Sequence, residues 1–261
     1  SNPSTTYRSM EQLRRNLESF YRVIQQALIR HGYVDQERDK LSFCFSKKFR
    51  YGRFTFSFRL EPVTSSVEVE PVRVYFDAVE AIIEGLDYPD KTNKWGTICD
   101  ELPEELISLH ERIKQSPTQD LALALGVATF RYIEEGIKQF EQDHSIPSNI
   151  IEELEYRDFW AMAFNGSPPE AMFRGLIFYQ LMSPELLPDK LHQSDQIFES
   201  RELVPDDAWR ISYQVLKEKL PRWKAYSTDV SAHSFTMPSS FHSAFSLKAI
   251  WAYLKKLYRN E

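Results

Sequence analysis

Cysteine and glycine are scarce in this chain. Its 261 residues include only two cysteines, Cys44 and Cys99, and eight glycines. Two cysteines in so long a chain do not form the disulfide framework of a small secreted protein, and without a Cys-x-x-Cys pair they supply no thiolate zinc site. The glycines are scattered and no Gly-Lys pair exists, which excludes a dinucleotide-binding fingerprint and a phosphate-binding loop. We interpret both cysteines as free thiols in a reducing compartment.

Long apolar runs are also missing. No stretch of 18 apolar residues occurs, so we expect no membrane span. The segment from Ser1 to Met10 is polar and lacks the apolar core of a secretory signal, so we expect a cytoplasmic protein. The net charge is −6 and the isoelectric point is about 5.6, whereas a dedicated nucleic-acid binder usually carries a basic balance or a large basic face. The overall charge therefore argues against that role, but a local basic patch stays possible.

Strict catalytic sequence motifs are absent as well. A zinc-protease pattern begins at His110-Glu111, but Lys114 stands where the second histidine ligand is required. No lysine has Asp or Glu two places before it, so the acid-x-Lys pattern of many metal-dependent nucleases is absent. Residues 229–243 crowd Ser, His and Asp together without a Gly-x-Ser-x-Gly elbow. We expect no cofactor and no metal, and a non-enzymatic role; a hydrolase or nuclease with a dispersed active site is the alternative.

Apolar and aromatic residues are well represented. Hydrophobic residues make up 42% of the chain and aromatic residues 14%. Phe, Tyr and Trp bury the most area per residue, so this composition predicts a folded protein with a sizeable core. A disordered chain would have the opposite composition.

The first predicted element is a long helix over residues 7–31. Its apolar positions advance in steps of three and four, which keeps them on one face; they are Leu13, Leu17, Phe20, Ile24 and Ala27. Gly32 follows, and glycine takes the left-handed conformation that ends many helices without steric cost. The stripe is too short for a sustained coiled coil, so we expect this helix to pack on the sheet that follows.

A strand block over residues 41–76 comes next. Apolar and mostly polar residues alternate here, as in strands with one buried face. The expected core residues are Phe43, Phe45, Phe54, Phe56 and Phe58. Gly52 permits a tight connection between the first two strands. In the third strand the apolar phase changes at Pro71, which cannot donate to a ladder, so we expect a bulge or an edge there.

The rest of the chain is predicted to be mainly helical. Capping-box patterns with proline at the first helical position begin at Ser116 and at Ser167. Residues 184–204 carry Pro, Asp and Ser and predict a long loop. Helices are expected near 206–220 and 244–258. The fold class is therefore α+β and mainly helical: a long N-terminal helix, a three-stranded antiparallel β-meander and a helical C-terminal part.

The best internal break lies between His144 and Pro147. It predicts an α+β part over residues 1–145 and a helical part over residues 146–261. The joining segment is short and unlike a linker, so we expect the two parts to pack as one globule.

The turn between the first two strands, residues 47–53, is the most distinctive local feature. Cations there are interleaved with aromatic residues, a combination that grips phosphates and stacks bases or offers a hot spot to an acidic protein; the set is Lys47, Lys48, Phe49, Arg50, Tyr51 and Arg53. A solvated turn whose charges discourage edge pairing is the plain alternative. Trp223, between charged neighbours, is a further candidate anchor.

Three functional hypotheses follow. The leading one is a binding or accessory protein that acts through protein–protein contacts in a multi-protein system. The alternatives are an enzyme with a dispersed active site and nucleic-acid binding through the turn 47–53. The sequence leaves the oligomeric state open.

Overall fold

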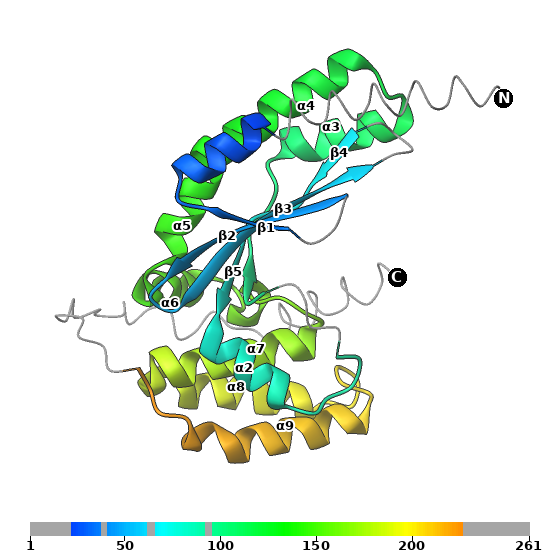
Figure 1. Cartoon of the computed structure of the whole chain (residues 1–261). Coiled ribbons are helices and arrows are strands. Elements are labelled where there is room, and N and C mark those ends of the chain that lie inside the picture. Colours follow the sequence, from blue (N-terminus) through cyan, green and yellow to red (C-terminus); the bar gives the residue numbers. More distant parts are fainter. Residues whose placement is uncertain (1–21, 38–40, 62–65, 92–95, 227–261) are drawn as a thin grey trace. The chain divides into compact units, whose positions relative to one another are not determined.

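The computed structural model describes residues 22–37, 41–61, 66–91 and 96–226 (Figure 1). The predicted helix at 244–258, the polar segment 229–243 and most of the N-terminal helix lie outside the described residues. The chain divides into two compact units. The first comprises Ser1–Tyr75 and Cys99–Ser145, and the second comprises Phe76–Ile98 and Ile146–Glu261.

The sheet has six strands and confirms the α+β, mainly helical class. The strands are β1 (Val34–Glu37), β2 (Ser42–Phe49), β3 (Gly52–Glu61), β4 (Ser66–Val69), β5 (Arg73–Phe76) and β6 (Ile98–Cys99). Their order is β1-β2-β3-β5-β6, and β4 also pairs with β3. The expected meander is therefore present as β2, β3 and the pair β4 and β5. The short strands β1 and β6 extend it beyond the three strands that the sequence predicted.

The third predicted strand is interrupted at Pro71, where the sequence predicted a bulge or an edge. β4 ends at Val69 and β5 begins at Arg73, and both pair with β3. Valines on either side of the break are buried, namely Val67, Val69, Val72 and Val74. The irregular residues around Pro71 thus absorb the change of phase and keep apolar side chains in the core on both sides of it.

The phenylalanines of β2 and β3 form the core that their alternation predicted. Phe45, Phe54, Phe56 and Phe58 are at most 1% exposed, whereas Phe43 is half-buried. Their face of the sheet is covered from the helical side, because Phe54 contacts Phe140 with ring centroids 6.1 Å apart. The polar positions differ from the expectation: Cys44, Ser46 and Thr55 are buried as well. Both faces of the sheet centre are therefore shielded from solvent.

The first unit also contains a helical segment over residues 22–30. This segment ends as predicted, at Gly32 with a φ of 87°. A helical hairpin follows later in the chain, made of α3 (Glu104–Gln115) and α4 (Gln119–Arg131). α4 continues through a π-helical turn, η1 (Tyr132–Ile137), into α5 (Lys138–His144). The cap of α4 is Thr118, whose hydroxyl accepts from the Leu121 amide, and not the predicted Ser116.

The second unit is helical. It contains α2 (Asp77–Gly85), α6 (Pro147–Tyr156), η2 (Trp160–Ala163), α7 (Pro168–Met182), η3 (Pro184–Leu186), α8 (Leu187–Glu199), α9 (Asp207–Lys219) and η4 (Leu220–Arg222). α7 is buried along nearly its whole length, and α2, α6, α8 and α9 all contact it. α7 is thus the central helix of this unit, as expected for a helix that is apolar on all sides.

The predicted loop over residues 184–204 is wrong, because α8 occupies most of it. The buried positions of α8 are spaced as in any amphipathic helix: Leu187, Lys190, Ser194, Ile197 and Phe198. Two of the five are polar residues, so the apolar stripe that would have predicted a helix is broken in the sequence. Pro188 lies in the first turn, where its missing N–H removes no helical hydrogen bond.

Candidate functional site

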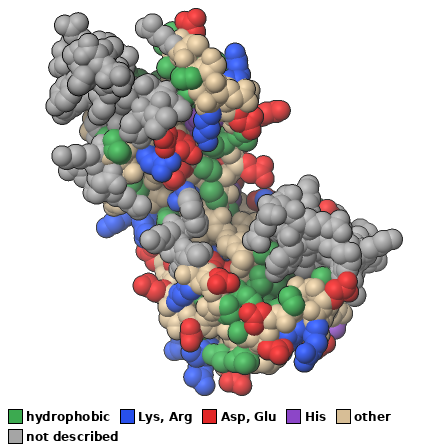
Figure 2. All heavy atoms as spheres, turned by 90° about the vertical axis from the view of Figure 1, so that its right-hand side faces the viewer, with side chains coloured by type: hydrophobic (Ala, Val, Ile, Leu, Met, Phe, Trp, Pro, Cys, Tyr) green, Lys and Arg blue, Asp and Glu red, His purple; other side chains and the backbone are tan. Residues whose placement is uncertain are grey.

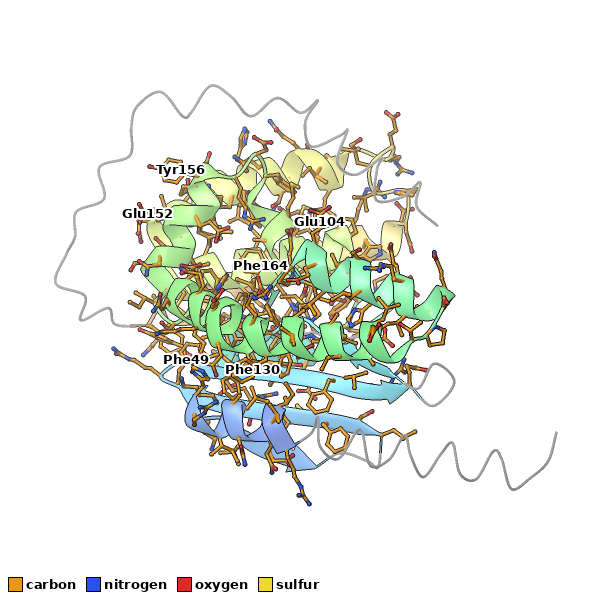
Figure 3. The ribbon with its side chains drawn as sticks, turned by 90° about the horizontal axis from the view of Figure 1, so that it is seen from above. Phe49, Glu104, Phe130, Glu152, Tyr156 and Phe164 are labelled. Atoms are coloured by element: carbon orange, nitrogen blue, oxygen red, sulfur yellow. The ribbon has the colours of Figure 1, made fainter. Side chains whose placement is uncertain are left out.

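The hairpin tip between β2 and β3 is built by a two-residue connection. Phe49 pairs with Gly52 in the ladder, so Arg50 and Tyr51 form the turn and Gly52 is the first residue of β3. The ring of Phe49, which is labelled in Figure 3, packs against Phe54 with centroids 4.7 Å apart. It also meets the edge of Tyr51 at 6.2 Å. These ring contacts hold the turn in place on its aromatic side.

Lys47 is directed to the helical face of the sheet. Its Nζ lies 2.7 Å from Oε1 of Glu141 on α5 and 5.9 Å from the ring centre of Tyr33. Glu141 is 13% exposed, so the pair is partly shielded. Lys47 therefore serves the contact between sheet and α5, and the structure separates it from the other predicted tip residues.

Lys48 and Arg53 lie on the opposite face, directly across from each other in the ladder. The guanidinium of Arg53 stacks 4.2 Å from the ring centre of Tyr75 on β5. The guanidinium of Arg50 lies 5.3 Å from the Tyr51 ring. Lys48 and Arg50 are exposed, and within the described residues neither forms an ion pair with a carboxylate.

We call the set Lys48, Arg50, Tyr51, Arg53 and Tyr75 the tip surface. Tyr75 was not among the predicted binding residues, because it belongs to β5 and only the sheet order brings it next to β3. Like charges directly opposite each other destabilise an antiparallel pair. The tip surface therefore holds three cations and two rings, with two of the cations placed unfavourably for the isolated hairpin.

Trp223 lies in the second unit and is not part of this surface. It is half-buried and follows the turn η4. Its carbonyl accepts from Nε2 of Gln180 at 2.8 Å, and three residues later the Tyr226 amide donates to the Leu181 carbonyl. The chain around Trp223 is therefore tied to the end of α7.

A buried polar centre lies at the Pro71 break, and sequence reasoning missed it. The Val72 amide donates to the hydroxyl of Tyr132 at 3.0 Å. That hydroxyl donates to Oδ2 of Asp100 at 2.8 Å, and the Asp100 amide donates to the Val72 carbonyl at 2.9 Å. The three residues close a ring of hydrogen bonds between the residue before β5, the first residue of η1 and the residue after β6. No pattern in the sequence indicates this role for the Tyr132 hydroxyl.

Burial shifts the pKa values of Asp100 and Tyr132 in this centre. Burial raises the pKa of Asp100, and the hydrogen bond from Tyr132 and the nearby His144 oppose that rise. Burial also raises the pKa of Tyr132, with the negative charge of Asp100 adding to it. Both groups thus hold their protons more tightly than in water. The Tyr132 hydroxyl already has two hydrogen-bond partners, so we interpret the centre as structural. It supplies the Val72 amide with an acceptor at the point where the strand is interrupted.

Cys99 lies beside this centre without the properties of a nucleophile. Burial raises the pKa of its thiol, although the positive charge of Arg73 acts in the other direction. A reactive cysteine needs a lowered pKa, since the thiolate is the attacking species. Cys99 and Cys44 are both free thiols, as expected.

His110, where the incomplete zinc-protease pattern begins, has a structural contact. Its Nε2 accepts from the amide of Val69 on β4 at 3.3 Å. Burial lowers the pKa of His110 below its ordinary value, and the charge of Glu68 opposes this. The neutral imidazole therefore joins α3 to β4.

The second unit contains a buried charged network around Arg174. Its Nη2 lies 3.0 Å from Oε1 of Glu80 on α2, and its Nη1 contacts Glu170, one turn earlier on α7. Arg174 is 1% exposed, and Thr97 also donates to Glu80 at 2.8 Å. Ser167 is the N-cap residue of α7 as predicted, but its side chain makes no cap bond, and the side chain of Glu170 contacts Arg174.

Lys190 on α8 is a second buried cation in this unit. Its Nζ lies 2.8 Å from Oε1 of Glu155 on α6 and 5.2 Å from the ring centre of Tyr179. The Tyr179 hydroxyl donates to the same Glu155 oxygen at 2.9 Å. Glu155 Oε1 therefore accepts from both Lys190 and Tyr179, as in a structural ion pair.

Comparisons with known proteins leave the family open. No protein-family model, curated protein or solved structure matches the chain. Within the described ranges, no group of three or more His, Cys, Asp or Glu side chains is placed to hold a metal ion. None of the helices described is long and apolar enough to cross a membrane.

Proposed function

We propose that the chain is a non-enzymatic, cytoplasmic binding protein that acts through protein–protein contacts in a multi-protein system. The tip surface is the contact, and an acidic segment of the partner is what it binds. The observation that carries this proposal is the exposure of Lys48 and Arg50 beside the Tyr51 ring at the hairpin tip.

Lys48 and Arg50 are exposed and form no ion pair with a carboxylate within the described residues, so both can meet an acidic group of a partner. Tyr51 and Tyr75 add apolar area beside the cations, and Arg together with Tyr is a combination enriched at interface hot spots.

The size of the patch favours a protein over a nucleic acid. Nucleic-acid affinity grows with the number of phosphates neutralised, and the tip surface offers three cations. Positive and negative side chains are interspersed over the face shown in Figure 2, and the chain as a whole carries a net charge of −6. A single acidic segment matches a patch of this size better than a phosphate backbone does.

The decisive experiment compares two charge reversals of equal size. The double variant Lys48→Glu and Arg50→Glu changes the tip surface. The control variant Arg112→Glu and Lys114→Glu changes two exposed cations on α3. Fluorescence anisotropy measures binding of each full-length protein to a labelled Glu-rich peptide containing aromatic residues, and to a labelled single-stranded oligonucleotide.

We expect the peptide to bind the unmodified protein and the α3 control alike, and the tip variant at least about tenfold more weakly, a change of about 1.4 kcal/mol. Oligonucleotide binding that is stronger than peptide binding, and that the tip variant abolishes, would establish the nucleic-acid alternative. Equal peptide binding by all three proteins would remove the tip surface from consideration. Mixing the chain with each protein encoded beside it tests the wider role, and failure to co-purify with any of them contradicts it.

A dispersed active site has one observation in its favour. The half-exposed carboxyl of Asp100 has a raised pKa, a property that general acids and bases share with buried structural groups. Hydrolase and nuclease substrates assayed with the unmodified protein and with Asp100→Asn test this alternative. An activity that Asp100→Asn removes without loss of folding would support it.

A further inference from the structure

Two cations of the tip surface lie on one face of the hairpin, close to each other. Lys48 on β2 pairs with Arg53 on β3 in the antiparallel register. Directly opposed residues point to the same side of a sheet, with their Cβ atoms about 4.5–5.5 Å apart. Lys48 is exposed and Arg53 is half-buried. One small anion above the ladder can therefore contact both side chains at once.

Aromatic rings hold the two arginines of the tip surface. The guanidinium of Arg53 lies 4.2 Å from the ring centre of Tyr75. That of Arg50 lies 5.3 Å from the ring centre of Tyr51. A guanidinium carries its N–H groups around the edge of its plane, where they form the fork that binds two oxygens of one carboxylate or phosphate. The rings restrict the orientations of the two forks, so less side-chain freedom is lost on binding.

The next ladder pair on this face is uncharged. Along a strand, every second residue points to the same side, so Ser46 and Thr55, which pair with each other, follow Lys48 and Arg53 on this face. Glu141, the carboxylate that pairs with Lys47, belongs to the opposite face. An anion above Lys48 and Arg53 is therefore not repelled by an acid at the adjacent ladder position.

The density of positive charge suits a phosphomonoester better than a carboxylate. A phosphorylated side chain carries a charge of about −1.5 to −2 at pH 7 and three strong acceptor oxygens. A carboxylate carries a single negative charge and two oxygens. The opposed cations Lys48 and Arg53 supply two positive charges, and Arg50 supplies a third at the turn. One dianion therefore matches the opposed pair, which a single carboxylate neutralises only in part.

We infer that the tip surface recognises a phosphorylated side chain within the acidic segment of its protein partner, and that the phosphoryl group lies between Lys48 and Arg53. This inference rests on the proposed function, because it names the group that the same surface binds. The phosphoryl group accepts charge-assisted hydrogen bonds that an unmodified hydroxyl cannot form. Binding is therefore conditional on a modification of the partner.

Three labelled peptides that differ at one position test the inference. They share one Glu-rich sequence and carry serine, glutamate or phosphoserine at its centre. Fluorescence anisotropy with the full-length protein should give a dissociation constant at least about tenfold lower for the phosphoserine peptide than for the serine peptide, and below that of the glutamate peptide. Equal binding of the phosphoserine and glutamate peptides overturns the inference and leaves the proposed function in place. Failure of all three peptides to bind contradicts the proposed function and the inference with it.

Conservative variants locate the phosphoryl group. Arg53→Lys keeps the charge and removes the planar fork, and Lys48→Gln removes the opposed charge. Each should reduce the affinity for the phosphoserine peptide to that for the glutamate peptide. The control variant Arg112→Glu and Lys114→Glu, which changes exposed cations on α3, should keep the full preference. A phosphoserine preference that survives both Arg53→Lys and Lys48→Gln would show that the phosphoryl group does not lie between these residues.

The charge of the phosphoryl group and its source are tested separately. Its second pKa is about 6, so the preference for the phosphoserine peptide over the glutamate peptide should shrink as the pH is lowered through this value. A preference that does not change with pH contradicts recognition of the dianion. Inorganic phosphate and a single-stranded oligonucleotide serve as competitors. Displacement of the phosphoserine peptide by either one at the concentration at which unlabelled peptide displaces it would show that a phosphate from another source is the ligand, and would overturn the inference.

Discussion

The hydroxyl of Tyr132 takes the place of a strand at the break in the sheet. It accepts the amide proton of Val72, 3.0 Å away, beside the proline that separates β4 from β5. Because Tyr132 also donates to Asp100, one side chain satisfies a backbone donor and a carboxylate at the same point. The π-helical turn η1 begins at this residue, and such turns change the direction in which side chains leave a helix.

Removing this hydroxyl should destabilise the first unit. Tyr132→Phe leaves the buried Val72 amide without its acceptor and the half-exposed Asp100 carboxylate without one of its donors, and an unsatisfied buried donor costs about 1–3 kcal/mol. Asp100→Asn keeps an acceptor for the hydroxyl and should cost less. Urea unfolding of the two variants measures the difference. A smaller loss for Tyr132→Phe than for Asp100→Asn would contradict the structural role assigned to the hydroxyl.

Gly136 should tolerate no side chain. A Cβ at this position would lie 2.5 Å from Cδ2 of Tyr132 and 2.8 Å from Cε2, so Gly136→Ala must displace the ring that holds the Val72 amide. We expect Gly136→Ala to lower the melting temperature. The matched substitution is Gly85→Ala at the end of α2, where nothing lies within 4 Å of the new atom. There alanine should be neutral or stabilise by about 0.5–1 kcal/mol.

The hydrogen bond between His110 and Val69 should make stability depend on pH. The folded-state pKa of His110 is lowered from its ordinary value of 6.5 by burial. A lowered pKa means that the unfolded chain binds the proton first, so the stabilisation is present above pH 6.5 and is lost as the pH falls through the folded-state pKa. Protonated His110 also cannot accept from the Val69 amide.

Unfolding free energies measured at several pH values around this window, for the unmodified chain and His110→Gln, isolate the contribution of His110. We expect the difference between the two proteins to shrink as the pH falls. A difference that does not change with pH would show that His110 does not titrate differently in the two states.

Breaking the network around Arg174 should be severe. Arg174→Met leaves Glu80 and Glu170 without the guanidinium that neutralises them, and removal of one partner from a buried ion pair costs about 3–5 kcal/mol. Arg157→Met is the comparison, because Arg157 pairs with Glu153 one turn away on the surface, where both side chains are at least 40% exposed. That pair is worth about 0.2–1 kcal/mol. Chemical denaturation of both variants checks the ratio, and comparable losses would contradict the burial of the network.

Particular residues explain why some elements could be predicted from the sequence and others could not. The phenylalanine alternation predicted β2 and β3 because a strand repeats every two residues. Pro71 has no amide to donate and so predicted a bulge or an edge, at the place where the structure has a break between two strands. α8 was missed because Lys190 and Ser194 occupy two of its buried positions. Lysine is buried there only because Glu155 and Tyr179, 35 and 11 residues earlier in the chain, neutralise and cover it. No local pattern contains that information.

The candidate sites also combine features that the sequence predicts with features that depend on the tertiary structure. The sequence by itself determined the basic and aromatic composition of the turn 47–53 and the apolar periods of the core. Only the tertiary structure decided that Lys47 pairs with Glu141, that Lys48 stands across from Arg53, and that Tyr75 joins them. Composition and period are properties of neighbouring residues, whereas register, burial and charge pairing depend on which distant segments meet.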